Sequence, residues 1–152
     1  MATYAQQLQD VVRQYQADHG GGTFQAKDVA AWAILKGLWK EHPSAIVNRC
    51  AEDLSRAMRE EYTVDAKGRR VRIKHAISVT RDGKQLTLWA DMRTATRSHM
   101  VLAFQQRRHQ VLGDCRQLKA DMDSYNETHN PGDPIQLIFD FALDLEELDL
   151  VA

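Results

Sequence analysis

The sequence predicts an α+β protein in which helices and strands form separate blocks. Three helical segments come first, a β-hairpin follows, and a long helix and a terminal acidic β-strand complete the chain. The prediction depends on two periodicities: apolar residues recur every three to four positions in the helical segments, and they alternate with other residues in the hairpin and in the last segment. We expect two parts, a domain at residues 1–92 and an appendage at residues 93–152.

The composition is that of a chain able to bury a core. Of its 152 residues, 43% are hydrophobic and 27% are charged, and no apolar run approaches the ~20 residues of a transmembrane helix. The N-terminal stretch lacks the basic start and apolar block of a secretory signal. Two cysteines, Cys50 and Cys115, fit a reducing compartment better than a disulfide framework. We therefore expect a cytoplasmic protein that does not enter a membrane.

Three stretches of the N-terminal part predict helices, at residues 3–18, 26–40 and 44–62. In the first, Thr3 and Gln6 have the spacing of a capping box, and three consecutive glycines follow its end. The second is apolar around most of its circumference, so we expect it to be buried on more than one side. The third has one polar and one apolar side. Its apolar stripe, which we expect to be buried, consists of Val47, Cys50, Ala51, Leu54, Ala57 and Met58.

Residues 69–91 predict a β-hairpin. Asp82 and Gly83 are a two-residue turn signal, because both central positions of that turn need a positive φ. Pairing Arg81 with Lys84 fixes a register in which one face is apolar and the other is mixed, as a sheet packed on helices requires. In that register Val79 pairs with Leu86, Ile77 with Leu88, His75 with Ala90, Ser78 with Thr87 and Ala76 with Trp89.

Residues 94–130 predict one long helix with a seven-residue apolar repeat. Such a repeat favours a partner helix, although Arg108 interrupts it. As a dimer seam the helix would join two copies of the chain, and as a core helix it would pack on its own domain. We favour self-association into a homodimer. The expected seam consists of Val101, Phe104, Val111, Cys115, Leu118, Met122 and Tyr125.

The last apolar segment has a different period. Residues 135–145 alternate strictly, which predicts an extended, half-buried strand. A lone strand leaves its backbone polar groups unpaired, so we expect it to join the hairpin or to pair with another chain. The segment around it is acidic, whereas residues 65–84 carry seven bases and two acids. This separation indicates a basic working surface and an acidic tail, or else two ordinary solvated faces.

Three helices followed by a glycine-turned hairpin, together with the stretch TFQAKDVAAWAIL, resemble a winged helix-turn-helix. The resemblance covers about residues 1–92 and depends on the order of the elements, because this fold has no invariant motif. It implies that the third helix is the recognition helix and that the hairpin turn is the wing.

The polar side of the third helix suits DNA on physical grounds as well. The major groove admits one helix, where arginine reaches guanine edges and asparagine reaches adenine edges. Bases on the hairpin suit phosphates, where they give affinity but little sequence information. Alternatively, Glu52 and Glu60 pair with Arg56 and the side is an ordinary exposed one. The expected DNA-binding residues are Ser44, Asn48, Arg49, Ser55, Arg56 and Arg59 on the helix and Arg70, Arg72, Lys74, Arg81 and Lys84 on the hairpin.

We therefore expect a DNA-binding protein, either a transcriptional regulator or a mobile-element accessory factor, that binds double-stranded DNA as a homodimer. The alternative is a protein–protein interaction module that docks through its acidic C-terminal strand, residues 135–149, by strand addition. A third hypothesis is a small-molecule pocket lined by Trp32, Trp39 and Trp89, although large aromatic residues usually pack in a core.

The sequence contains no motif typical of catalysis or metal binding. There is no nucleophile elbow and no phosphate-cradling glycine loop. The histidines form no i,i+4 pair and the cysteines form no Cys-x-x-Cys, so their spacing does not suit a metal site. We expect no enzymatic activity, no metal and no cofactor, and we expect Cys50 and Cys115 to serve packing.

Overall fold

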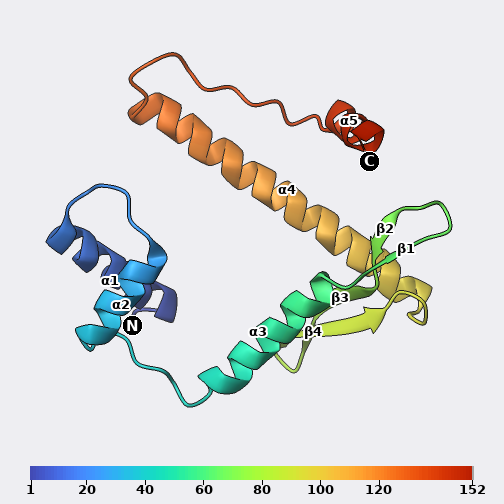
Figure 1. The fold of residues 1–152 in the computed structure, drawn as a ribbon, viewed down its shortest axis with the longest axis horizontal. Helices are drawn as coiled ribbons and strands as arrows, with labels where there is room; N and C mark the ends of the chain where they lie inside the picture. Colours follow the sequence, from blue (N-terminus) through green and yellow to red (C-terminus); the bar gives the residue numbers. More distant parts are fainter. Residues whose placement is uncertain (152) are drawn as a thin grey trace. The chain divides into compact units, whose positions relative to one another are not determined.

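The computed structural model describes residues 1–151 and confirms a mixed α+β fold (Figure 1). The chain divides into two compact units, Met1–Arg56 and the residues from Ala57 onward. The winged-helix arrangement of the first three helices stays a prediction. Within the described residues the elements are α1 (Tyr4–His19), α2 (Ala26–Leu35), α3 (Ala45–Arg59), β1 (Tyr62–Val64), β2 (Arg70–Arg72), β3 (Lys74–Arg81), β4 (Lys84–Asp91), α4 (Arg97–Thr128) and α5 (Ala142–Val151).

Helix α1 begins with the predicted capping box. The backbone N–H of Thr3 donates to the Gln6 side chain (2.8 Å), and the backbone N–H of Gln6 donates to the Thr3 hydroxyl (3.1 Å). These two bonds satisfy amide groups that the first turn of a helix leaves unpaired. The helix ends at Gly20, whose φ of +88° suits a residue without a side chain.

Helices α1 and α2 pack on each other through a small apolar and aromatic core. Val29 and Ala33 of α2 are buried. Tyr15 of α1 meets Trp32 edge-on, with 5.6 Å between the ring centroids. Trp39 donates a hydrogen bond from Nε1 to the hydroxyl of Tyr4 (2.8 Å). Aromatic pairs of this geometry fix the two helices to each other beyond simple area burial.

Helix α2 is shorter than predicted, because it ends at Leu35 and not near residue 40. Gly37 takes a φ of +70°, and the N–H of Leu38 donates back to the carbonyl of Ala33 (2.9 Å). This is a glycine-based helix stop, which the apolar pattern by itself does not reveal. The expectation of burial on more than one side is also wrong at this end, since Leu35 is 88% exposed.

Helix α3 lies within the predicted range, but its apolar stripe is uncovered. Val47 is 71% exposed and Leu54 is 58% exposed; Cys50 is exposed as well, and Met58 is half-buried. The prediction of a buried stripe is therefore wrong for most of the helix. An amphipathic pattern shows which side of a helix can be buried, and it does not show that a partner is present.

The β3–β4 hairpin has the predicted register in every pair, from Arg81 opposite Lys84 to Lys74 opposite Asp91. Helix α4 packs beside β3, where Ala103 is fully buried. The side-chain amide of Gln106 accepts a hydrogen bond from the N–H of Ser78 (2.8 Å) and donates one to its carbonyl (3.0 Å). Gln106 thus takes the place of a neighbouring strand at this edge.

A second hairpin, β1–β2, precedes the predicted one. Its strands pair over three residues each. Ile73 joins the two hairpins: its N–H donates to the carbonyl of Glu61 (3.1 Å), and its carbonyl accepts from the N–H of Met92 (2.8 Å). The prediction that Arg70, Arg72 and Lys74 all lie on one hairpin is therefore wrong, because the first two belong to β2 and the third begins β3.

Helix α4 confirms the predicted long helix, whereas the predicted strand at residues 135–145 is wrong. Residues 134–141 pair with no strand, and α5 begins at Ala142. The side chain of Asn126 holds the return from α4 by bonding both the N–H and the carbonyl of Ile135 (2.9 and 2.8 Å). Leucine, alanine and glutamate favour a helix in α5, and no edge strand is paired with the alternating segment.

Candidate nucleic-acid interface

The tip of the β3–β4 hairpin presents two cations side by side. Asp82 and Gly83 have φ values of 52° and 74°, as the predicted two-residue turn requires. Arg81 and Lys84 are opposite each other in the register and both are exposed. Neither forms an ion pair with any residue in the described part of the chain. Their charges are therefore open to an anion from solution.

Two cations of the β1–β2 hairpin, Arg69 and Arg70, are engaged within the hairpin. Asp65 accepts hydrogen bonds from the backbone N–H of Arg69 (2.9 Å) and from its Nε (2.7 Å). These bonds hold the pKa of Asp65 below its ordinary value. The guanidinium of Arg70 lies 3.8 Å from the centre of the Tyr62 ring, a cation–π contact. The turn of this hairpin therefore has less available charge than its sequence indicates.

Lys74 is compensated more fully than any other predicted phosphate contact. Its Nζ lies 3.5 Å from a carboxylate oxygen of Glu61 and 3.5 Å from one of Asp91, and its side chain is only 27% exposed. Hydrogen bonds from Arg93 lower the pKa of Asp91 and keep this partner ionised. Such a lysine stabilises the junction of the strands and leaves little charge for phosphate.

His75 of β3 is a buried polar residue. Its Nε2 donates to the carbonyl of Arg72 (3.0 Å), and within residues 1–151 its buried Nδ1 has no hydrogen-bond partner. Burial is the main reason that its pKa lies below the ordinary value, and the charges of Arg107 and Arg72 lower it further. His75 is therefore neutral near pH 7, and His99 donates to its backbone carbonyl (2.9 Å).

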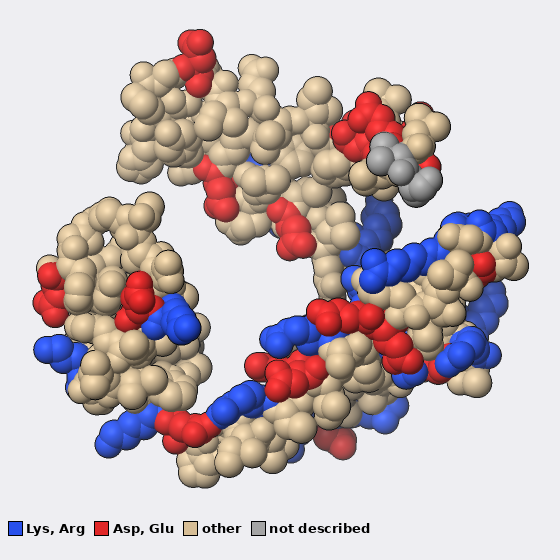
Figure 2. Space-filling model, in the orientation of Figure 1, with Lys and Arg blue, Asp and Glu red and all other residues tan. Residues whose placement is uncertain are grey.

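Sequence reasoning missed the cations of α4, the helix whose N-terminal part packs beside β3. The signal was present in the charge count: residues 67–119 contain thirteen Lys and Arg against three Asp and Glu, whereas residues 120–152 contain nine acids and no base. Figure 2 shows blue atoms gathered over the hairpin region and red atoms at α5. The added cations are Arg97, Arg107, Arg108 and Arg116, all exposed.

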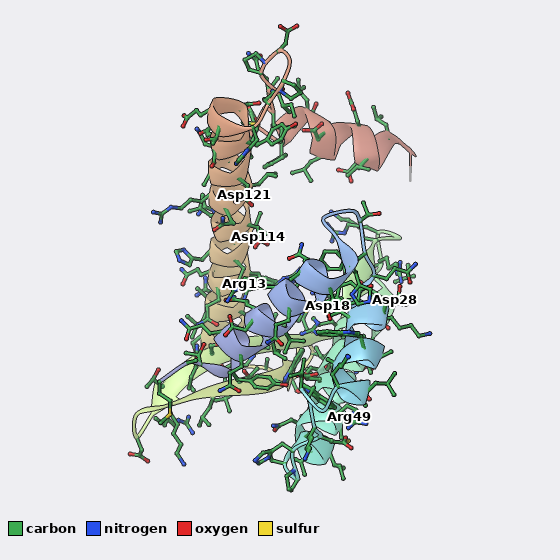
Figure 3. All side chains as sticks on the ribbon, turned by 90° about the vertical axis from the view of Figure 1, so that its left-hand side faces the viewer. Arg13, Asp18, Asp28, Arg49, Asp114 and Asp121 are labelled. Carbon is green, nitrogen blue, oxygen red and sulfur yellow. The ribbon has the colours of Figure 1, made fainter. Side chains whose placement is uncertain are left out.

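The predicted base-reading residues are exposed on α3, apart from Ser55, which is half-buried. Arg49, which Figure 3 labels, pairs with Glu41, and Arg56 lies 3.5 Å from Asp53. The alternative pairing of Arg56 with Glu52 or Glu60 is not among the ion pairs of the described residues. Ser44, Asn48, Arg49, Ser55 and Arg56 belong to the first unit, whereas Arg59 belongs to the second unit together with the hairpins.

Ser44 does not have a free side chain. Its hydroxyl and its backbone N–H both lie within hydrogen-bonding distance of Nδ1 of His42, at 2.8 and 3.2 Å. A phosphate at this end of α3 would compete with the imidazole for the same donors.

The predicted seam of α4 is open over most of its length. Val111 is 57% exposed, Leu118 is 49% exposed and Tyr125 is 42% exposed. Cys115 and Met122 are half-buried. At the other end Phe104 is half-exposed and meets the ring of His75 edge-on, with 5.5 Å between the centroids. Whether a second copy covers this stripe stays a proposal.

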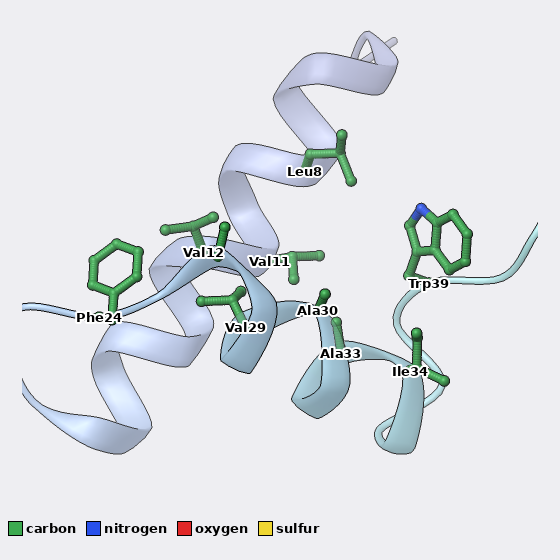
Figure 4. Close-up of a pocket in the computed structure, with 10 residues that line it drawn as sticks. Leu8, Val11, Val12, Phe24, Val29, Ala30, Ala33, Ile34 and Trp39 are labelled. Carbon is green, nitrogen blue, oxygen red and sulfur yellow. The ribbon is translucent and has the colours of Figure 1, made fainter. Parts of the chain in front are cut away.

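An apolar cavity of about 420 Å³ opens between α1 and α2 (Figure 4). Its lining includes Leu8, Phe24 and Trp39. Trp32 instead packs against Tyr15, and Trp89 belongs to the second unit. The hypothesis of one pocket lined by all three tryptophans therefore has no support in the arrangement of these residues.

No protein-family model, curated protein or solved structure matches this chain. Among residues 1–151, no helix is long and apolar enough to cross a membrane. The same residues contain no group of three or more His, Cys, Asp or Glu arranged to hold a metal ion.

Proposed function

We propose that the protein binds double-stranded DNA through the basic surface formed by its hairpins and the first two-thirds of α4. The observation that carries this proposal is the charge of residues 67–119. This stretch carries thirteen bases and three acids, and all of it belongs to the second unit. Phosphate neutralisation by lysine and arginine supplies most of the affinity of such surfaces. The hairpin tip and Arg97, Arg107 and Arg116 of α4 give affinity and orientation along the backbone.

The third helix adds sequence specificity in this proposal. Asn48, Arg56 and Arg59 are exposed on α3, and arginine and asparagine form the bidentate contacts that distinguish bases. A transcriptional regulator or a mobile-element accessory factor needs such a helix in addition to phosphate contacts. Replacing Arg56 and Arg59 by alanine should weaken binding to a preferred site more than binding to random duplex.

The test is the salt dependence of binding to a duplex of about 30 base pairs. Contacts to four phosphates release counterions, so the affinity should fall roughly 10²-fold between about 50 and 200 mM salt. A single-stranded oligonucleotide of the same length serves as the comparison. Affinity that does not change with salt, or no binding at 50 mM salt, would exclude the proposal.

A protein-interaction module remains the second candidate because the acidic C-terminal segment is uncovered. Ile138 is 83% exposed and Leu143 is 71% exposed, on a segment with acids and no bases. Exposed apolar residues of this kind mark interaction sites. Deleting residues 134–152 should abolish capture of a protein partner and leave duplex binding intact or strengthen it, since the deletion removes five acids. A deletion variant that keeps its full activity would exclude this second candidate.

A further inference from the structure

We propose that α4 pairs with α4 of a second copy of the chain in an antiparallel orientation. The surface concerned is the open part of the seven-residue repeat on α4, here called the α4 stripe: Phe104, Val111, Cys115, Leu118, Met122 and Tyr125. An apolar repeat of this period favours packing against a matching helix.

Most contacts of α4 with the rest of its own chain lie on other sides of the helix. Each residue of a helix is rotated about 100° from the one before it. Relative to Ala103, the side chains of His99 and Gln106 lie about 40° and 60° around the helix axis in one direction. Both residues contact the β3–β4 hairpin. Val111 and Leu118 turn about 80° and 60° to the other side. The hairpin therefore leaves the α4 stripe open from Val111 onward, while Phe104 contacts the ring of His75 in β3.

The returning segment covers a third side, near the C-terminal end of α4. Residues 134–139 line a shallow cavity with Lys119, Met122 and Asn126, which half-buries Met122 at the edge of the stripe. Val111, Leu118 and Tyr125 keep 42–57% of their surface exposed. The α4 stripe therefore has room for an apolar partner, and a second α4 offers the same apolar residues.

The charges of α4 are divided between its two ends. Its first two-thirds carry Arg97, Arg107, Arg108 and Arg116 against Asp114. Its last nine residues carry Asp121, Asp123 and Glu127 and no base, and Lys119, just before them, pairs with Asp123. Figure 3 labels Asp114 and Asp121 on this helix. Antiparallel helices place the basic end of one copy beside the acidic end of the other, and parallel helices place like charges together.

The register follows from the apolar residues. Aligning Val111 with Cys115 of the second copy also aligns Phe104 with Met122 and Val101 with Tyr125, which are all apolar pairs. Arg108 then meets Leu118 of the second copy, one turn from Asp121. In a parallel dimer Arg108 would face Arg108 inside the seam, where an unpaired cation is costly.

The first experiment measures the mass of the full chain in solution at about 100 µM. We expect about twice the 17.4 kDa of one chain. Leu118→Asp should give a monomer with unchanged helix content, because the hairpin contacts of α4 end before residue 111. Leu148→Asp on α5 is the matched control and should stay dimeric. A monomeric wild type, or a Leu118→Asp variant that stays dimeric, would overturn the proposal.

The second experiment decides the orientation with spin labels on Gly113→Cys or Ser124→Cys, in a background with Cys50→Ser and Cys115→Ala. Gly113 lies at the centre of the antiparallel register and a side chain there meets open space. The two Ser124 labels are offset by about 33 Å along the axis at 1.5 Å per residue, so their separation should exceed that of the Gly113 labels by more than about 10 Å. Equal separations would show a parallel dimer.

A third variant has opposite effects in the two orientations. The antiparallel register brings Asp114 of both copies together, so Asp114→Asn should tighten the dimer about twofold. A parallel dimer would pair Asp114 with Lys119 of the second copy, and the same substitution would then weaken it, which contradicts the proposal.

Discussion

The two hairpins of the second unit differ in what their basic residues do. In β1–β2, Arg69 bonds Asp65 and Arg70 lies on the Tyr62 ring. In β3–β4, Arg81 and Lys84 flank the turn without an ion pair in the described residues. The sequence of both turns is basic, yet Arg69 and Arg70 are engaged within their own hairpin, whereas Arg81 and Lys84 are not. Net charge along a segment therefore overestimates the charge that a phosphate can meet.

The hairpins differ in burial as well, and this difference gives the largest expected effect. Ile77 of β3 is 9% exposed, whereas Val64 of β1 is 67% exposed. Ile77→Ala should lower the free energy of unfolding by about 2–4 kcal/mol, because it leaves a cavity. Val64→Ala should change it by less than about 0.5 kcal/mol.

Urea unfolding measures these two values, with Trp89 of β4 as the fluorescence reporter in a background of Trp32→Phe and Trp39→Phe. Similar losses for the two substitutions would show that β1–β2 shares the core of β3–β4.

The charges give the next largest effect. Arg81→Ala with Lys84→Ala should lower duplex affinity about tenfold at about 100 mM salt, because two phosphate contacts are lost. Arg69→Ala with Arg70→Ala removes the same net charge and should lower it by less than about threefold. Fluorescence anisotropy with one labelled duplex measures both. An equal loss in the two double variants would mean that only total charge matters.

The smallest effect concerns pH and His75. Its pKa is lowered by burial, so the unfolded chain takes up a proton more readily than the folded chain as the pH falls. The free energy of unfolding should therefore decrease as the pH falls from about 7.5 through the ordinary histidine pKa of about 6.5.

His75→Leu should remove part of this pH dependence, and His109→Leu, at an exposed position on α4, should not. Urea unfolding at pH 7.5 and 5.5 checks the pair. A pH dependence that His75→Leu leaves unchanged would assign it to another group.

Local signals predicted the elements that need few neighbours. The capping box at Thr3 and the turn at Asp82 and Gly83 formed as expected, and the register of β3–β4 followed from the turn. The helix over 94–130 was predicted within three residues at each end. Each of these features is determined by residues close together in the chain, so it can be predicted from the sequence.

The predictions that needed a partner were the wrong ones. The stripe of α3 that includes Val47 and Leu54 was expected to be buried and is exposed. Residues 135–145 were expected to form a strand, and α5 begins at Ala142. The β1–β2 hairpin was missed, because three-residue strands carry too little alternation to detect.

By itself the sequence determined the order of the helices, the register of the main hairpin and the separation of basic residues from the acidic C-terminal segment. Only the tertiary structure decided which of the cations are compensated, as Lys74 is between Glu61 and Asp91, and which sides of α4 the chain covers. The physical reason is distance along the chain. Turns, caps and periodicity arise from neighbouring residues, whereas ion pairs and burial depend on residues that meet only after folding.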